Sequence, residues 1–429
     1  MTSNPACKLM AGAILFLTLG FAPSLHAAPL NWDQCVKEAA DNNPDLKISA
    51  ASLQQARYGK SSATGKFLPQ LSAGASHSRS GDEGSLGGIL HDADPNDRTS
   101  VSLSLSQNLF NGFKDKASYD RASAQVETAQ AQYESSRAQV SRDLKSAFYG
   151  LLYAQQQVPM LEEIAARRRE NVRMVELRYK SGRENKGSFL QSQASSAQAD
   201  YEVEQAKRSL RLAQRQLARV LGRSELDHLE VAGDFDVHSP GESPDFKRMA
   251  TGIPSSRIAA MQLKSARAQV TTARGAFLPS LNASGSMSRG GNEWMPDNPS
   301  WSAGLNLSLP LFSGGQDAFN LKSAKSASEQ ARIEATTAEK DAALRLEDAF
   351  SSFQDAVEAT EVQKKSLEAA QVREQIASAQ YANGLLSYQD WDQLESSLIS
   401  SEKSRLQGLR AAKVAEADWE LAQGKGELP

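Results

Sequence analysis

The sequence has few of the residues on which catalytic and metal chemistry depends. It holds two cysteines and five histidines among 429 residues. Cys7 belongs to the N-terminal segment, so Cys35 has no partner for an intramolecular disulfide. The histidines are scattered without metal-ligand spacing, and no phosphate-binding loop or serine-nucleophile elbow occurs. These absences predict a protein that is not an enzyme and that uses no metal or other cofactor.

The sequence also lacks an excess of one charge. Its 48 basic residues nearly balance 51 acidic residues, so electrostatics give no reason to expect nucleic acid as a partner. Aromatic residues make up 7% and hydrophobic residues 40% of the chain. This composition favours a helix-rich protein with polar faces over one with a large globular core.

Long hydrophobic runs are missing outside the N-terminus. There, Lys8 precedes an apolar run from Leu9 to Phe21, and Ala27 and Ala28 follow. This pattern predicts a secretory signal peptide over residues 1–27, cleaved after Ala27 or Ala28. A short membrane anchor is the alternative, but the run is shorter than the roughly 20 residues that a spanning helix needs. If the mature chain enters a membrane, we therefore expect it to do so by strands.

A composite pattern occurs twice, about 200 residues apart. The segment Phe67-Leu68-Pro69 recurs as Phe277-Leu278-Pro279, so Pro69 and Pro279 mark the turn before each pair of strands. The later landmarks also recur, Leu109-Phe110-Asn111-Gly112 as Leu311-Phe312-Ser313-Gly314 and Tyr179 to Gly182 as Tyr381 to Gly384. We expect two structural repeats, 28–222 and 255–424, joined by a linker at 223–254 and followed by a tail at 425–429.

Each repeat contains two segments with a two-residue period. Strands are predicted at about 69–80, 99–109, 279–289 and 300–310, with one apolar and one hydroxyl face. The residues predicted to face lipid are Val101, Leu103, Leu105, Leu305 and Leu307. The loops Ser80 to Arg98 and Arg289 to Pro299 are predicted to be solvent-facing hairpin connections. The edge of a soluble sandwich is the alternative.

Four strands cannot close a barrel, because about eight is the smallest working number. Backbone groups that face lipid must all be paired. If these strands enter a membrane, the chain must therefore form an oligomer.

The remaining segments have helical patterns. Helices are predicted from Asn31 to about Lys66, over 114–181 and 316–383, and over the returning segments 188–221 and 390–422. Residues 316–383 lack glycine and proline, and about 1.5 Å per residue gives a helix on the order of 100 Å long. Alanines spaced by seven predict close, supercoiled packing: Ala117, Ala124, Ala131 and Ala138.

Two features of the first long helix carry separate expectations. Pro159 is expected to bend it, because an interior proline removes a backbone hydrogen bond. The triplet Arg167-Arg168-Arg169 is interpreted as a solvated face rather than as a site for an anionic partner. A cytoplasmic or fibrous coiled coil would also explain long helices, but it does not explain the signal peptide and the alternating strands.

Together, these motifs resemble those of the TolC family of outer-membrane efflux and secretion proteins. The resemblance covers essentially the whole mature chain. It implies a mainly α fold with a β-barrel portion: a homotrimer with a twelve-stranded barrel in the outer membrane of a Gram-negative bacterium, in contact with its lipid, and an α-helical tunnel in the periplasm. The implied partners are a periplasmic membrane-fusion adaptor and an inner-membrane pump of the RND, ABC or MFS type.

The function implied is that of a passive exit duct in a tripartite efflux system. A type I protein secretion duct is the alternative of the same fold, and a secreted coiled-coil scaffold is the alternative of another class.

The resemblance also assigns roles to residues. The Tyr-x-x-Gly turn and the start of the returning helix form the periplasmic entrance in this family. The implied gate residues are Tyr381, Gly384, Asp390, Asp392 and Gln393. Asp390 stands where a ring aspartate is expected, although a first-turn acid stabilised by the helix dipole explains it too. Gln393 stands where a second acid is expected, and Asp392 is a nearby substitute.

The helix tips implied to dock the adaptor are Tyr179, Gly182, Asn383 and Gly384.

Overall fold

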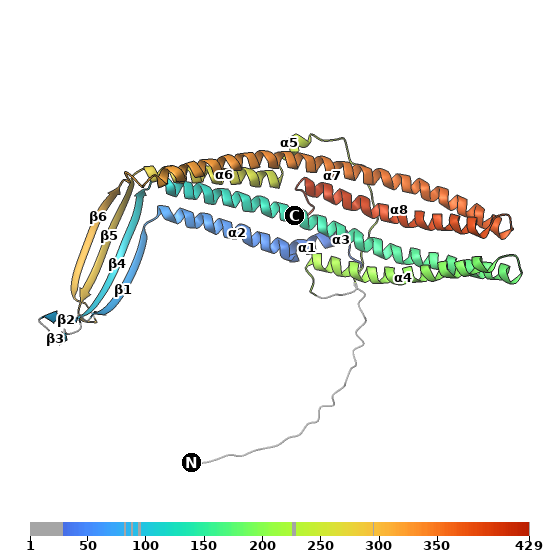
Figure 1. Ribbon diagram of the computed structural model, residues 1–429, viewed down its shortest axis with the longest axis horizontal. Coiled ribbons are helices and arrows are strands. Elements are labelled where there is room, and N and C mark those ends of the chain that lie inside the picture. Colours follow the sequence, from blue (N-terminus) through green and yellow to red (C-terminus); the bar gives the residue numbers. More distant parts are fainter. Residues whose placement is uncertain are drawn as a thin grey trace, which may run out of the picture.

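The chain forms a small sheet at one end of a long helical bundle (Figure 1). This computed structural model describes residues 29–80, 83–86, 89–92, 96–224, 229–294 and 296–428. The predicted signal peptide lies outside the described residues. Most of the described chain is helical, which confirms the predicted mainly α fold with a strand portion.

The main sheet contains four antiparallel strands in the order β1-β4-β5-β6. Its strands are β1 (Gln70–Ser80), β4 (Asn96–Phe110), β5 (Ser280–Gly291) and β6 (Asn298–Ser308). The strand pairs of the two repeats join through β4 and β5. Pro69 and Pro279 directly precede β1 and β5, each after a short 3₁₀ turn at Gly65–Phe67 or Gly275–Phe277.

The connection between β1 and β4 contains strands of its own. β2 (Glu83–Leu86) pairs with β3 (Ile89–Asp92), and β4 begins at Asn96. The prediction of a plain loop from Ser80 to Arg98 was therefore wrong. Its Gly- and Asp-rich composition concealed two strands of four residues each, which are too short to show a clear two-residue period.

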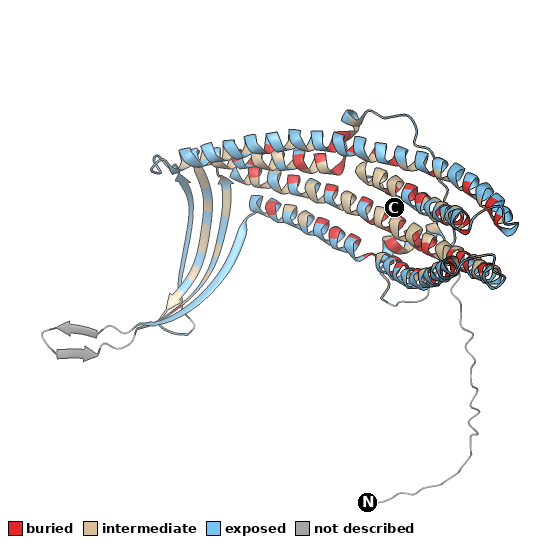
Figure 2. Ribbon diagram, turned by 45° about the vertical axis from the view of Figure 1, so that its right-hand side comes forward, coloured by how far each residue is buried: buried red, intermediate tan, exposed pale blue. Residues whose placement is uncertain are grey.

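The register gives the main sheet one apolar face and one hydroxyl face. Leu103 pairs with Ala73 and Met287, and the neighbouring Ser102 pairs with Gly74 and Ser288. Serine pairs hydrogen-bond across the strands on the hydroxyl face, between Ser76 and Ser100 at 2.8 Å, Ser286 and Ser302 at 2.9 Å, and Ser288 and Ser300 at 2.7 Å. The five residues predicted to face lipid are 44 to 71% exposed (Figure 2). At the far end of this apolar face the ring of Trp294 lies 6.0 Å from that of His77, but none of the described segments covers these five residues.

Two helices of 67 residues each form the length of the bundle, α3 (Lys114–Lys180) and α7 (Gln316–Ala382). The returning helices are α4 (Lys186–Leu221) and α8 (Tyr388–Ala422), and α6 (Pro254–Arg274) leads into β5. Helix α3 packs against α4, α6 and α8. Its heptad alanines at 117, 124, 131 and 138 are at most 2% exposed, which confirms the close packing predicted from their spacing. None of the described helices combines the length and hydropathy needed to cross a membrane.

The helix predicted from Asn31 to Lys66 is in fact two helices. These are α1 (Trp32–Asn42) and α2 (Pro44–Thr64). The break follows from Pro44, which takes the first position of α2, where its missing N–H costs nothing. The Asn43 side chain accepts hydrogen bonds from the backbone N–H groups of Asp45 and Leu46 and so caps α2.

Shorter helices meet end to end alongside the long ones. Gly222 ends α4 with φ of +76°, and a Cβ there would lie 2.5 Å from the carbonyl oxygen of Asn42 in α1. Gly424 follows α8 with φ of +67°, and a Cβ there would lie 2.3 Å from Pro254 in α6. Glycine is required at both junctions, because the backbone is left-handed and the neighbouring helix leaves no room for a side chain.

The largest apolar core lies at the middle of the molecule. Leu144, Phe148 and Leu151 of α3 pack there with Leu217 and Leu221 of α4. The predicted linker and tail also enter this core, through the buried residues Leu229, Val231 and Leu428. The linker also holds the short helix α5 (Phe246–Ala250) and pairs at Val231 with Leu30. Both segments therefore pack as parts of the fold.

Candidate channel entrance at the helix tips

The two helical hairpins turn at the end of the bundle opposite the sheet (Figure 1). Gly182 and Gly384 follow α3 and α7 with φ of +72° and +77°. In the first turn, the N–H of Arg183 donates to the carbonyl of Arg178 at 2.8 Å, and the N–H of Leu385 donates to that of Gln380 at 2.9 Å in the second. These bonds satisfy the last carbonyls of each helix and need a left-handed residue, which is why glycine recurs.

The tyrosines at the two tips have different environments. Tyr179 stacks on Phe189 with ring centroids 5.6 Å apart and stays partly exposed. Tyr381 is fully buried and stacks on Trp391 at 4.5 Å. Its hydroxyl donates to Glu184 at 3.1 Å, and burial followed by this carboxylate raises the pKa of Tyr381 to about 12. Tyr381 therefore packs between the hairpins as a neutral side chain.

Arg178 ties the second tip to the first. Its Nη1 donates to the carbonyl of Tyr381 at 2.8 Å, and its guanidinium lies 4.6 Å from the centroid of the Tyr381 ring. Such a contact combines a charge-assisted hydrogen bond with attraction to the ring face. The tips of the two repeats are thus held together by Arg178 and Glu184 of one repeat and Tyr381 of the other.

Asp390 lies in the first turn of α8 and is exposed. Its N–H donates to the Ser387 hydroxyl at 3.2 Å, and that hydroxyl donates to Asp390 Oδ2 at 2.7 Å. This geometry caps the helix and places a negative charge where the helix dipole favours it. Gln393, one turn further along α8, is also exposed. The two side chains leave the same side of the helix.

Asp392 instead faces the neighbouring helix. Its Oδ1 lies 2.6 Å from Arg168 Nη1, and the same nitrogen lies 3.2 Å from Glu395 Oε2. Glu395 is 3% exposed and also accepts a hydrogen bond from Asn171, while Arg168 Nη2 donates to Ser396 at 2.9 Å. Burial raises the pKa of Glu395, and the Arg168 charge partly counters this. Asp392 is therefore engaged within the protomer.

Glu395 was missed at the sequence level. Acids three residues apart at 392 and 395 share one helical face, and a basic triplet occurs on another long helix. Those two observations together indicate a buried charge cluster.

The interpretation of the arginine triplet as a solvated face was wrong for Arg168, which is buried. Each arginine reaches a different acid: Arg167 lies 2.7 Å from Glu402 of α8, and Arg169 lies 2.6 Å from Asp200 of α4. Only Arg169 is more than half exposed. Three consecutive residues span about 200° around a helix, so one triplet can reach helices on several sides.

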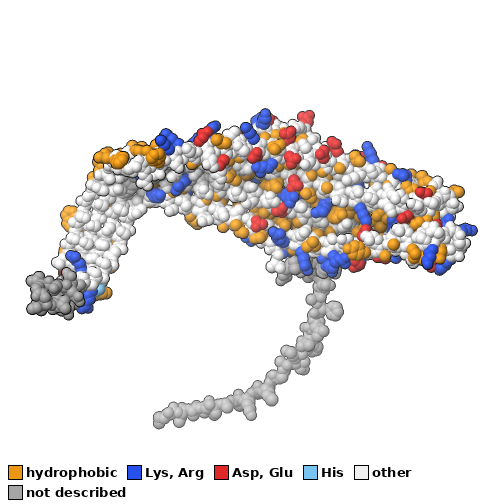
Figure 3. Space-filling view, in the orientation of Figure 1, with side chains coloured by type: hydrophobic (Ala, Val, Ile, Leu, Met, Phe, Trp, Pro, Cys, Tyr) orange, Lys and Arg blue, Asp and Glu red, His pale blue; other side chains and the backbone are white. Residues whose placement is uncertain are grey.

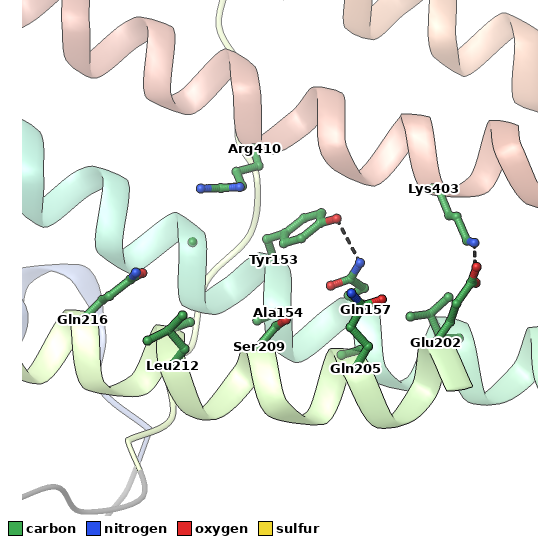
Figure 4. A pocket seen from close by; sticks show the side chains of 14 residues that line it. Tyr153, Ala154, Gln157, Glu202, Gln205, Ser209, Leu212, Gln216, Lys403 and Arg410 are labelled. Atoms are coloured by element: carbon green, nitrogen blue, oxygen red, sulfur yellow. Dashed lines mark hydrogen bonds and ion pairs between the residues drawn. The ribbon is translucent and has the colours of Figure 1, made fainter. Parts of the chain in front are cut away.

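A polar pocket of about 480 Å³ lies between α3, α4 and α8 (Figure 4). Several of its polar groups are paired with one another. The Lys403 ammonium lies 2.5 Å from Glu202, and Gln157 donates to the Tyr153 hydroxyl at 3.0 Å. Arg410 lies over the Tyr153 ring at 5.5 Å. This lining offers no nucleophile with an adjacent base, and the described residues contain no cluster of three metal-ligating side chains.

The model of the family named Outer membrane efflux protein matches residues 35–223 and 254–424. The chain belongs to this family. The match spans both repeats and omits most of the segment between them. Membership of this family confirms the resemblance that the repeated motifs indicated, and it places the chain among outer-membrane channels with a periplasmic helical part.

Individual relatives of this family member are distant in sequence. The chain is 24% identical over 407 residues to the cation efflux system protein CusC of Escherichia coli, covering 91% of this chain and 85% of the relative. It is 26% identical over 292 residues to the alkaline protease secretion protein AprF of Pseudomonas aeruginosa, covering 65% and 60%. The crystal structure of the outer membrane protein VceC of Vibrio cholerae superposes with a TM-score of 0.78 at 21% identity, covering 92% and 96%.

Proposed function

We propose that this protein is the outer-membrane exit duct of a tripartite efflux system and works as a homotrimer. The observation that carries the proposal is the four-stranded sheet, whose leucine face is uncovered and which joins directly to two 67-residue helices. Lipid would cover the leucine face. Three copies would supply twelve strands and pair the free edges of β1 and β6, as a membrane requires.

In this assembly the protein would act as a passive duct and would catalyse no reaction. The hydroxyl faces of the sheets would line a wet lumen, and the long helices would continue it as a tunnel into the periplasm. An inner-membrane pump would supply the energy and a periplasmic adaptor the connection. The exposed residues of the tips, Tyr179 and Asn383 beside the Gly182 and Gly384 turns, would contact the adaptor.

Type I protein secretion is the second candidate, and the relative that favours it is AprF, a protease secretion protein. Both candidates use one fold, so the adaptor that docks at the tips is the feature that would distinguish them.

The experiment that tests the proposal places a photo-crosslinking amino acid at Asn383 in living cells. We expect the protein to fractionate with the outer membrane as a trimer and to capture an adaptor. Capture of an adaptor that serves a drug or metal exporter supports efflux, and capture of one that serves an ATP-driven protein exporter moves the assignment to secretion. A soluble periplasmic monomer would contradict both and favour a scaffold.

We further propose that Asp390 lines the entrance, together with Gln393, so that three copies form one acidic ring. Support comes from its exposure in the first turn of α8. Replacing Asp390 with Asn removes the charge but keeps an acceptor for the Ser387 hydroxyl. Block of the channel by divalent cations should weaken in planar bilayers. Block equal to that of the unaltered protein would leave Asp390 as a helix cap only.

A further inference from the structure

The hydroxyl face of the sheet carries almost no charge. Strand pairing stays in phase up to a register shift between Asn108 and Phe110 of β4. Within the in-phase part, this face is formed by the even-numbered residues from 70 to 80, 98 to 106, 280 to 290 and 298 to 308. Serine, glycine, asparagine and glutamine occupy these described positions, except one. The exception is Arg98, which pairs in register with Ser78.

The other arginines of the sheet lie on the opposite face. Arg79 pairs with Asp97 in register, and their side chains approach to 3.6 Å. Arg289 pairs with Val101, in line with the leucines. The three arginines at the far end of the sheet are therefore divided, one on the hydroxyl face and two on the apolar face. Figure 3 shows basic side chains at this end, while the rest of the sheet is mostly uncharged.

The position of Arg98 along the strand is also informative. β1 starts beside the helices at Gln70 and β4 returns to them at Phe110, so Arg98, near the start of β4, lies at the end remote from the bundle (Figure 1). Its side chain is exposed, and none of the described residues forms an ion pair with it.

We propose that Arg98 forms a single cationic ring at the outer mouth of the barrel and makes this mouth favour anionic over cationic solutes. The inference rests on the trimeric barrel of the proposed function. Rings of arginine or lysine are a known physical basis of anion preference in pores, and the described positions of the hydroxyl face hold no acidic residue that would oppose this ring. Because the lumen is wide and wet, the effect should depend on salt. The screening length is about 30 Å at 0.01 M salt but about 3 Å at 1 M.

A cysteine placed on the lumen wall can report this potential. Ser102 lies on the same face as Arg98 and four residues further in, roughly 13 Å away along the strand. Trimers carrying Ser102→Cys are treated with an anionic or a cationic methanethiosulfonate, and the two reaction rates are compared. Cys35 is fully buried and should contribute little background, which is measured in trimers without the new cysteine.

We expect the ratio of anionic to cationic rate at about 0.01 M salt to fall several-fold when Arg98→Gln is added, and to fall further with Arg98→Glu. The ratios measured with Arg, Gln and Glu at position 98 should converge at about 1 M salt. Arg79→Gln is the matched control, because it removes the same charge from the opposite face, where that charge is paired with Asp97, and should lower the ratio much less.

Equal ratios with and without Arg98 at low salt would overturn the proposal. So would an equal response to Arg79→Gln. Failure of the proposed function is seen separately, because the protein then yields no trimer from the outer membrane, whichever residue stands at position 98.

Discussion

The Arg168 guanidinium is the shared partner of two carboxylates on α8, those of Asp392 and Glu395. The first is 21% and the second 3% exposed, so water can compensate little of the charge if the arginine is lost. A buried carboxylate without its partner is costly, whereas an exposed ion pair contributes little. The stability of the tip region therefore depends on one residue of the arginine triplet far more than on the others.

Replacing Arg168 with Met should weaken the packing of α8 on α3 by about 3 to 5 kcal/mol. The change keeps much of the side-chain volume and removes only the charge and its hydrogen bonds. Amide hydrogen exchange over residues 388–399 measures the free energy of local opening. Arg169→Met is the control, since its pair with Asp200 is half exposed and should be worth less than about 1 kcal/mol. Equal exchange in the two variants would show that the buried cluster does not hold the tip.

The local chemistry of the tips could be predicted from the sequence, but their packing could not. The Tyr-x-x-Gly spacing predicts both turns, because a left-handed residue must follow a helix at that point. The same spacing gives no hint that Tyr381 is buried while Tyr179 is partly exposed. That difference arises from Trp391, which stacks on Tyr381 within the same hairpin, and from Arg178, which reaches the Tyr381 ring only when the two hairpins pack together.

At the scale of elements, the strands were easier to predict than the first helix. The Ser-Leu alternation fixes which residues share a face, whatever the strands pair with. In the helix predicted from Asn31 to Lys66, the apolar periodicity continues across Asn43 and Pro44, although these residues form a cap and a first helical position. Pro159 occurs inside α3, which continues through it, and the bend there stays a prediction.

Replacing Leu105 with Arg should impair assembly of the barrel by about 2 to 4 kcal/mol if this residue lies near the middle of the membrane. The reason is the cost of placing a charge in lipid. Ser104→Arg is the matched control, because it introduces the same side chain one residue away on the hydroxyl face. The measurement is the yield of trimer in outer-membrane fractions. A similar loss in both variants, or none in either, would contradict the assignment of the two faces.

At the scale of the whole molecule, a buried lysine gathers segments that are far apart in the chain. Lys145 of α3 is 5% exposed and lies 2.6 Å from Glu420 of α8 and 2.7 Å from Glu427 of the tail. Trp32 of α1 also donates a hydrogen bond to Glu427. The sequence could not have predicted this cluster, because the tail has no periodic pattern and its role depends on helices that approach from both repeats.

Removal of residues 424–429 should therefore destabilise the molecule at its middle. The truncation loses the burial of Leu428, worth about 1.5 to 3 kcal/mol, and the hydrogen bond at 3.0 Å from the Glu427 N–H to Ser141. It also removes the Glu427 carboxylate, one of the two that lie closest to the Lys145 ammonium. We expect the melting temperature of the purified protein to fall by several degrees.

Two variants separate the causes of this fall in melting temperature. Glu427→Gln removes the charge but keeps the buried leucine, so its melting temperature should fall by less than that of the truncated chain. Lys425→Ala alters an exposed side chain of the same tail and should have little effect. If the truncated chain melts like the full-length protein, the tail does not contribute to the core. The stability of the middle must then come from the contacts of α3 with α1, α4, α8 and the linker, because these segments supply the remaining partners of Leu144, Phe148 and Lys145.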